Sequence, residues 1–241
     1  VGSEMCIRDS RTRVVPLNFA GTFQKAKEAL DLDWCARTEA DGESLAQALD
    51  EAAELAQQVY DRAAAINRGQ APGEDVGRLE RQLLDLFQRT QDTFVRIDWY
   101  GNVQFPQESL QESLELLHGA ADSLTAGNLS AALRKLYEID NNRYAFLFEQ
   151  RVYRHFTQYV FSQPKERLKW GYRRIVGYIN LYATVKSLLE KKARGITDYT
   201  AEAAFLQGAA AAQEGAYRDL VGSLNISVEE MKRMLRDCLP R

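Results

Sequence analysis

The feature that most constrains the fold is a run of apolar residues between positions 45 and 66 that recurs every three or four residues. Its members are Leu45, Leu49, Ala52, Ala56, Val59, Ala63 and Ile66. Alternating spacings of four and three place these side chains on one face of an α-helix. The sequence therefore predicts a helix that ends near Gly69 and must bury this seam.

A second helical pattern follows a turn-forming stretch at residues 70–73. Its apolar positions are Val76, Leu79, Leu83, Leu86, Phe94 and Ile97. We predict an antiparallel hairpin of the two helices, because the alanines of the first seam allow close approach of the backbones. The heptad spacing of residues 45–66 also motivates a second hypothesis, that this face mediates a homodimer.

Helical signals resume after a break at residues 101–102. Pro106 suits the first turn of a helix, Gly127 suits its end, and Asn128 or Ser130 can cap a shorter helix that follows. The apolar positions of this pair are Leu110, Leu114, Leu117, Ala121, Leu124, Leu133, Leu136 and Tyr137. The pair resembles one tetratricopeptide-like unit, but no second copy follows at a period of about 34 residues, which argues against a repeat array.

The rest of the chain is also helical by pattern. Residues 140–195 are rich in aromatics and are divided by Pro164, and residues 201–224 form a helix whose small residues Gly208, Ala212 and Gly215 offer a packing face. A last helix is predicted to begin at Ser227, since Ser227 and Glu230 match a capping box. The class is all-α, an antiparallel bundle of about eight to ten helices that spans residues 21–241, with a subdivision allowed near 101–106.

Residues 1–10 lack both a helical period and the apolar core of a secretory signal. They resemble translated adapter sequence at the ends of metagenomic reading frames, so we interpret them as a non-native tail and residues 11–20 as a linker. On this interpretation the native protein extends upstream of Arg11. The alternative is a genuine disordered tail.

Composition predicts an ordinary soluble globular protein, with 45% hydrophobic and 27% charged residues. No apolar run approaches the roughly 18 residues of a transmembrane helix. The three cysteines, Cys6, Cys35 and Cys238, are an odd number without C-x-x-C spacing. A disulfide framework is therefore disfavoured, and a reducing compartment such as the cytoplasm is slightly favoured.

Few residues could carry catalysis, since the chain has two histidines, His118 and His155. Glu115 and His118 have the Glu-x-x-His spacing of a di-iron bundle, but such a site needs a second copy that the sequence lacks. Cys35 lies on a predicted helix with no histidine nearby in sequence, which favours an inert buried thiol. Glu138 and Asp140 are interpreted as solvated carboxylates. We therefore predict no catalytic, cofactor-binding or metal-binding residue in this chain.

Charge is distributed unevenly along the sequence. Residues 143–194 contain twelve Lys or Arg and three Glu, while the whole chain has a net charge of −3. Basic residues among aromatics are typical of single-strand nucleic-acid binding, or of contact with anionic lipid. The favoured interpretation is that this segment packs beside the acidic stretch at residues 28–61, in the same molecule or a second copy, because its aromatics have core-like helical spacing and basic stems often cover such rings. Nucleic-acid binding is accordingly disfavoured.

Several segments together resemble one known family. They are LYEIDNNRYAF at 136–146, VY at 152–153, FTQYV at 156–160, RLKWG at 167–171 and LYATVKSL at 181–188. This set resembles the helical C-terminal region of bacterial zinc-dependent aminopeptidases related to the glutamate-carboxypeptidase and transferrin-receptor group. The segment VPLNF at 15–19 is similar to the linker that joins such a region to the catalytic domain.

The resemblance implies a non-catalytic helical module that supports a peptidase domain, shapes its cleft or mediates dimerisation. In that family the zinc ligands belong to a preceding α/β domain, and no position of this chain matches them. Zinc is therefore expected only in an upstream domain, and the expected partners are that domain and a second copy. The alternative function is a free-standing helical scaffold for protein interactions.

Overall fold

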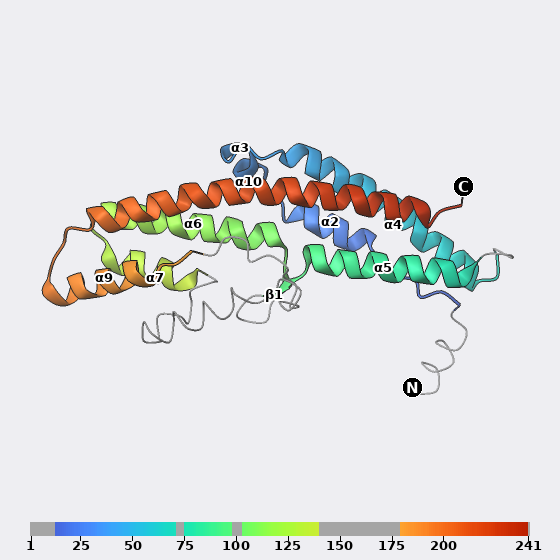
Figure 1. Ribbon diagram of the computed structural model, residues 1–241, viewed down its shortest axis with the longest axis horizontal. Helices are drawn as coiled ribbons and strands as arrows, with labels where there is room; N and C mark the ends of the chain where they lie inside the picture. Colours follow the sequence, from blue (N-terminus) through green and yellow to red (C-terminus); the bar gives the residue numbers. More distant parts are fainter. Residues whose placement is uncertain (1–12, 71–74, 98–102, 140–178, 241) are drawn as a thin grey trace, which may run out of the picture. The chain divides into compact units, whose positions relative to one another are not determined.

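The computed structural model describes residues 13–70, 75–97, 103–139 and 179–240. Over these residues the chain is all-α, as predicted, with one antiparallel pair of two-residue strands, β1 (Arg96–Ile97) and β2 (Val103–Gln104) (Figure 1). The helices are α2 (Ala20–Glu28), α3 (Leu32–Arg37), α4 (Gly42–Asn67), α5 (Val76–Phe94), α6 (Pro106–Thr125), α7 (Leu129–Glu138), α9 (Tyr182–Arg194) and α10 (Thr200–Asp237).

The described residues fall into two compact units, and each unit draws on several stretches of the chain. Of the described residues, unit 1 contains 13–30, 41–70, 75–94 and 222–240. Unit 2 contains 31–40, 95–97, 103–139 and 179–221. Helix α10 therefore contributes its first part to unit 2 and its last part to unit 1.

The core of unit 1 is built on the seam of α4. All seven predicted seam residues are buried, and the helix ends at Asn67, where Gly69 adopts a left-handed φ of 74°. The prediction for this helix and its end is confirmed. Since the seam is buried within this chain, it is not an exposed face for a second copy, and the dimer hypothesis loses this motivation.

Helix α4 lies close to α2, and the apolar pattern at residues 45–66 does not predict this neighbour. Lys27 of α2 binds Asp50 of α4, and Val14, just before α2, binds Asn67 at the far end of α4, so the two helices run antiparallel. Their backbones lie close together along their length. Small residues on both helices, including Ala26 and Ala52, permit this approach.

Among the described helices α4 makes its closest backbone contacts with α2, and the predicted hairpin of α4 and α5 is not confirmed. The predicted helix over 76–97 is also too long, because α5 ends at Phe94 and Ile97 lies in β1, paired with Val103. Val95 and Ile97 are β-branched, which favours extended backbone over helix. Phe94 meets Phe23 of α2 edge to face, with ring centroids 5.9 Å apart.

Unit 2 contains the predicted helix pair α6 and α7, which pack closely. Pro106 occupies the first turn of α6, and the Phe105 N–H donates to the Glu108 carboxylate at 2.7 Å. Gly127 adopts a φ of 73°, and the Asn128 side chain accepts the Ala131 N–H at 3.1 Å. These caps confirm Asn128 as the helix start and exclude Ser130.

Two predictions about the C-terminal region are wrong. Ser227 does not begin a helix, because α10 runs unbroken from Thr200 to Asp237 and buried Leu224, Val228 and Met231 continue one apolar stripe through the expected start. The predicted small-residue packing face is also wrong. Gly208 is exposed, with no atom within 4 Å of the place where a Cβ would stand.

The packed face of α10 in unit 2 contains none of the predicted small residues. It consists of the buried side chains Ala203, Leu206, Ala210, Gln213 and Tyr217. These are spaced by three or four residues and so lie on one face of the helix, which combines alanines with larger side chains and contains no glycine.

Candidate functional site

Glu115 and His118, the two candidates for a metal site, lie on α6 but do not converge on one point. His118 Nε2 is 2.9 Å from the Glu214 carboxylate of α10. Trp34 of α3 donates its Nε1–H to Glu115 through a long bond of 3.5 Å and stacks on the His118 ring, with centroids 5.9 Å apart. The two side chains therefore hold α3 through Trp34 and are satisfied by protein partners.

No group of three or more His, Cys, Asp or Glu that could hold a metal ion occurs among the described residues. Glu138 is exposed at the end of α7. Asp140 and His155 lie outside the described residues, so their predictions stay untested.

Cys35 is buried, with 2% of its surface exposed, and its Sγ lies 3.6 Å from the Tyr217 hydroxyl. Gln111 of α6 donates its Nε2–H to the same hydroxyl at 2.8 Å. Tyr217 is fully buried, and this burial, with the neighbouring Cys35, raises the pKa of its phenol well above the ordinary value. Neither the neutral phenol of Tyr217 nor the amide of Gln111 acts as a general base, so the described contacts of this cluster suit packing and not nucleophilic chemistry.

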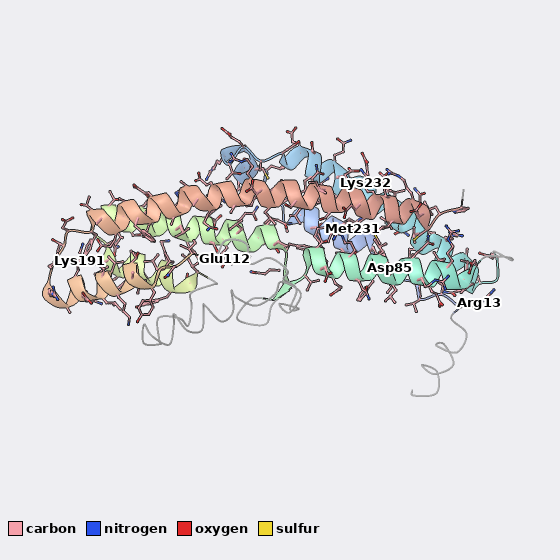
Figure 2. All side chains as sticks on the ribbon, viewed as in Figure 1. Arg13, Asp85, Glu112, Lys191, Met231 and Lys232 are labelled. Carbon is pink, nitrogen blue, oxygen red and sulfur yellow. The ribbon has the colours of Figure 1, made fainter. Side chains whose placement is uncertain are left out.

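Sequence reasoning missed a buried lysine in unit 1. Lys232 on α10, labelled in Figure 2, has 5% of its side chain exposed and lies 2.6 Å from both Glu51 of α4 and Glu229. Burial alone would lower the pKa of Lys232, but the bonds with Glu229 and Glu51 outweigh it and raise the pKa. The sequence indicates only the pair of Glu229 and Lys232, which are three residues apart and so adjacent on an ordinary helix.

A similar buried carboxylate occurs in unit 2. Glu202, in the first turn of α10, accepts from Lys191 Nζ and Ser187 Oγ, each at 2.7 Å. Burial would raise the pKa of Glu202, but the bonds from Lys191 and Ser187 outweigh it and lower the pKa. Lys191 belongs to the basic segment at 143–194, of which residues 179–194 are described. Its charge is therefore used to fasten α9 to α10 (Figure 2).

An apolar hollow of about 340 Å³ lies in unit 1 where the entry segment meets α5. Val15 and Leu17 form one side, and Leu83, Leu84 and Phe87 form the other. Three of its lining side chains, Val15, Leu84 and Phe87, are 59%, 54% and 40% exposed, so large apolar side chains gather here at the surface. The hollow is therefore the best candidate for an interaction surface among the described residues.

The entry segment is held in place by Asn67, the last residue of α4. Its Oδ1 accepts the backbone N–H groups of Arg13 and Val14, both at 2.9 Å, and its Nδ2 donates to the Val14 carbonyl at 2.8 Å. Val14 is fully buried, so the segment predicted as a linker is anchored at this point. The anchor fixes one wall of the hollow.

Comparisons of the chain with protein-family models, curated proteins and solved structures find no match. Over the described residues, none of the helices combines the length and the apolar character needed to cross a membrane. The fold therefore defines the described residues only as an all-α chain, and the features that bear on function are its exposed surfaces and hollows.

Proposed function

We propose that this chain is the non-catalytic helical accessory or dimerisation region of a bacterial zinc metallopeptidase of the aminopeptidase type. The catalytic domain, with its zinc ions, would precede Arg11. We further propose that the whole chain forms an antiparallel bundle of eight to ten helices. The family resemblance of residues 134–190 and of the segment at 15–19 motivates the assignment.

One observation carries the proposal, the apolar hollow beside the entry segment. A preceding domain would be tethered through residues 11–13, and Asn67 fixes the direction of the chain there. A tethered domain has a high effective concentration close to its tether, so a modest apolar surface is enough to bind it. Exposed Leu84 and Phe87 provide such a surface.

The genomic DNA upstream of Arg11 gives the direct test. We expect an in-frame α/β domain with His, Asp and Glu metal ligands. The protein expressed from the complete frame should hydrolyse aminoacyl substrates in a zinc-dependent way, and Leu84→Gln with Phe87→Gln should loosen the interface and lower activity. Phe205→Gln, which removes an exposed aromatic from α10, is the matched control. A start codon beside Arg11 would overturn the proposal.

The second candidate is a free-standing helical interaction scaffold, favoured by the close contact of α6 with α7, whose sequence pattern resembles one tetratricopeptide-like unit. It predicts a start codon beside Arg11. Sedimentation of the 241-residue chain tests the related dimerisation hypothesis. A dimer that Leu84→Gln and Phe87→Gln dissociate supports it, and a monomer at micromolar concentration contradicts it.

Nucleic-acid binding through residues 143–194 is the weakest candidate. In the described part of this segment Lys191 is bound to Glu202, and Lys186 lies over the Tyr182 ring at 5.3 Å. The hypothesis predicts affinity for single strands that falls steeply with salt. No binding in low salt would exclude it.

A further inference from the structure

A small polar hollow in unit 1 has the character of an anion site. Its volume is about 250 Å³, and its walls come from α4, from the first two turns of α5 and from the end of α10. Each helix contributes one arginine: Arg62, Arg78 and Arg236. The lining also contains two aspartates, Asp75 and Asp237, so it carries one net positive charge.

One of these carboxylates is already used by the protein. Asp75 Oδ1 accepts the backbone N–H of Arg78 at 3.0 Å and so caps the start of α5. The N-terminal end of a helix carries a partial positive charge, which favours an anion nearby. The Asp75 carboxylate already occupies this position at the start of α5, so the attraction for a further anion comes from the arginines.

The end of α10 would normally oppose an anion, because the last carbonyl groups of a helix are partly negative. Here those carbonyls are bonded to donors. Arg62 Nη1 donates to the Cys238 carbonyl, and Gln82 Nε2 donates to the Asp237 carbonyl at 3.2 Å. The Leu239 N–H donates to the Arg236 carbonyl at 3.0 Å. Three carbonyl groups at this end of α10 therefore already accept hydrogen bonds from the protein.

The chemistry of the lining selects the ligand class. Arginine forks bind phosphate and carboxylate oxygens through paired, charge-assisted hydrogen bonds. Pockets for drug-sized molecules usually measure about 300–1,000 Å³, so this one suits a smaller group. We propose that the hollow binds a phosphate group, either as free phosphate or as the end of a small phosphomonoester. This inference does not depend on the proposed peptidase role.

Calorimetric titration of the 241-residue chain with inorganic phosphate, at low ionic strength, tests the site. We expect saturable binding that chloride at equal ionic strength does not reproduce. Arg78→Gln and Arg236→Gln should each weaken binding by about tenfold or more, the usual size of one charge-assisted bond. Both side chains are exposed, so the variants should fold, and circular dichroism checks this.

Arg81→Gln and Arg233→Gln are matched controls, because they remove the same charge from exposed positions of α5 and α10 that do not line the hollow. Glycerol phosphate separates the two sources of the ligand. Binding of glycerol phosphate as tight as that of phosphate, or tighter, indicates a monoester site, and binding of phosphate alone indicates a free-anion site. The proposal fails if millimolar phosphate does not bind, or if the controls weaken binding as much as the lining variants do.

Discussion

Two buried polar side chains of α10, one in each unit, make contacts of different chemistry. In unit 1 a buried ammonium group, Lys232, binds the carboxylates of Glu51 and Glu229. In unit 2 a buried neutral hydroxyl, that of Tyr217, lies between Gln111 and Cys35. A charged contact gains its strength from the ionised state of both partners, whereas a neutral one does not change between acid and neutral pH. One helix can therefore be held by one contact whose strength changes with pH and by another whose strength does not.

The largest expected effect is on the neutral attachment. Tyr217→Ala removes a fully buried ring and should lower the free energy of unfolding by about 3–5 kcal/mol, because the lost burial is compounded by a cavity. Urea denaturation followed by circular dichroism measures it.

Tyr217→Phe is the matched variant that keeps the ring and removes only the hydroxyl. It should lower the free energy of unfolding by about 1–3 kcal/mol, since Gln111 loses an acceptor. A loss as large as that of the alanine variant would show that the hydrogen bonds, and not the packing, hold this attachment.

The next effect on stability concerns Cys238, whose neutral thiol is buried in unit 1. Burial raises the pKa of its thiol to about 11, against an ordinary value of 9.0. The unfolded chain therefore releases a proton that the folded chain keeps, and stability present below pH 9.0 is lost as pH rises toward 11. The loss should be on the order of 2 kcal/mol.

Cys238→Val tests this assignment, because valine has a similar size and does not titrate. The difference in unfolding free energy between the wild type and Cys238→Val should be constant below pH 9.0 and shift above it. If the two proteins follow parallel curves up to pH 11, the thiol does not contribute.

A smaller effect is expected at the charged attachment. Lys232→Met keeps the length of the side chain and removes its charge, and it should cost about 1 kcal/mol at neutral pH, because Glu51 and Glu229 are half exposed and water can solvate them. The pKa of Glu51 is lowered by its bonds with Lys232 and Gln47, so this contribution is present above pH 4.5 and fades as pH falls through the folded value. The pKa of Lys232 is raised, so the contribution is also lost well above pH 10.5.

The distinction between the two contacts can be tested by measuring the free energy of unfolding of both variants over a range of pH. The gap between wild type and Lys232→Met should close in acid, whereas the gap between wild type and Tyr217→Phe should stay level from acid to neutral pH. Equal behaviour of both gaps would contradict the distinction between the two attachments.

The smallest effect is expected at His118. His118→Gln should change the free energy of unfolding by less than about 1 kcal/mol, since the side chains of His118 and Glu214 are 45% and 35% exposed and water can replace their contact. Zinc affinity should be the same for both proteins, as measured by competition with a chelator. Zinc binding that depends on His118 would contradict the structural role of Glu115 and His118.

What the sequence could predict is the local part of this structure. The α4 seam, the turns at Gly69 and Gly127 and the cap at Asn128 depend on residues within one or two helical turns, and they are confirmed. Local signals can also mislead, because Ser227 and Glu230 match a capping box inside a continuous helix. The box is only a preference, and the apolar stripe through Leu224 and Val228 outweighs it.

The contacts of the candidate site residues could not be predicted, because they join residues that are far apart in the sequence. Cys35 and Tyr217 are 182 positions apart, and Trp34 and Glu115 are 81 apart. No periodicity within one helix records which side chain of another helix will face it. The three arginines of the proposed phosphate hollow likewise come from three helices, and each looks like an ordinary surface charge in the sequence.

Asn67 has a consequence for chemical ageing. Its amide gives Val14 the same pair of hydrogen bonds, one donated and one accepted, that a residue of a neighbouring β-strand would exchange. Hydrolysis of the amide to aspartate would keep the size of the side chain but replace the donor with an oxygen facing the Val14 carbonyl. One atom exchanged at the end of α4 would thus release the entry segment and dismantle one wall of the apolar hollow, while the buried seam of the helix stayed intact.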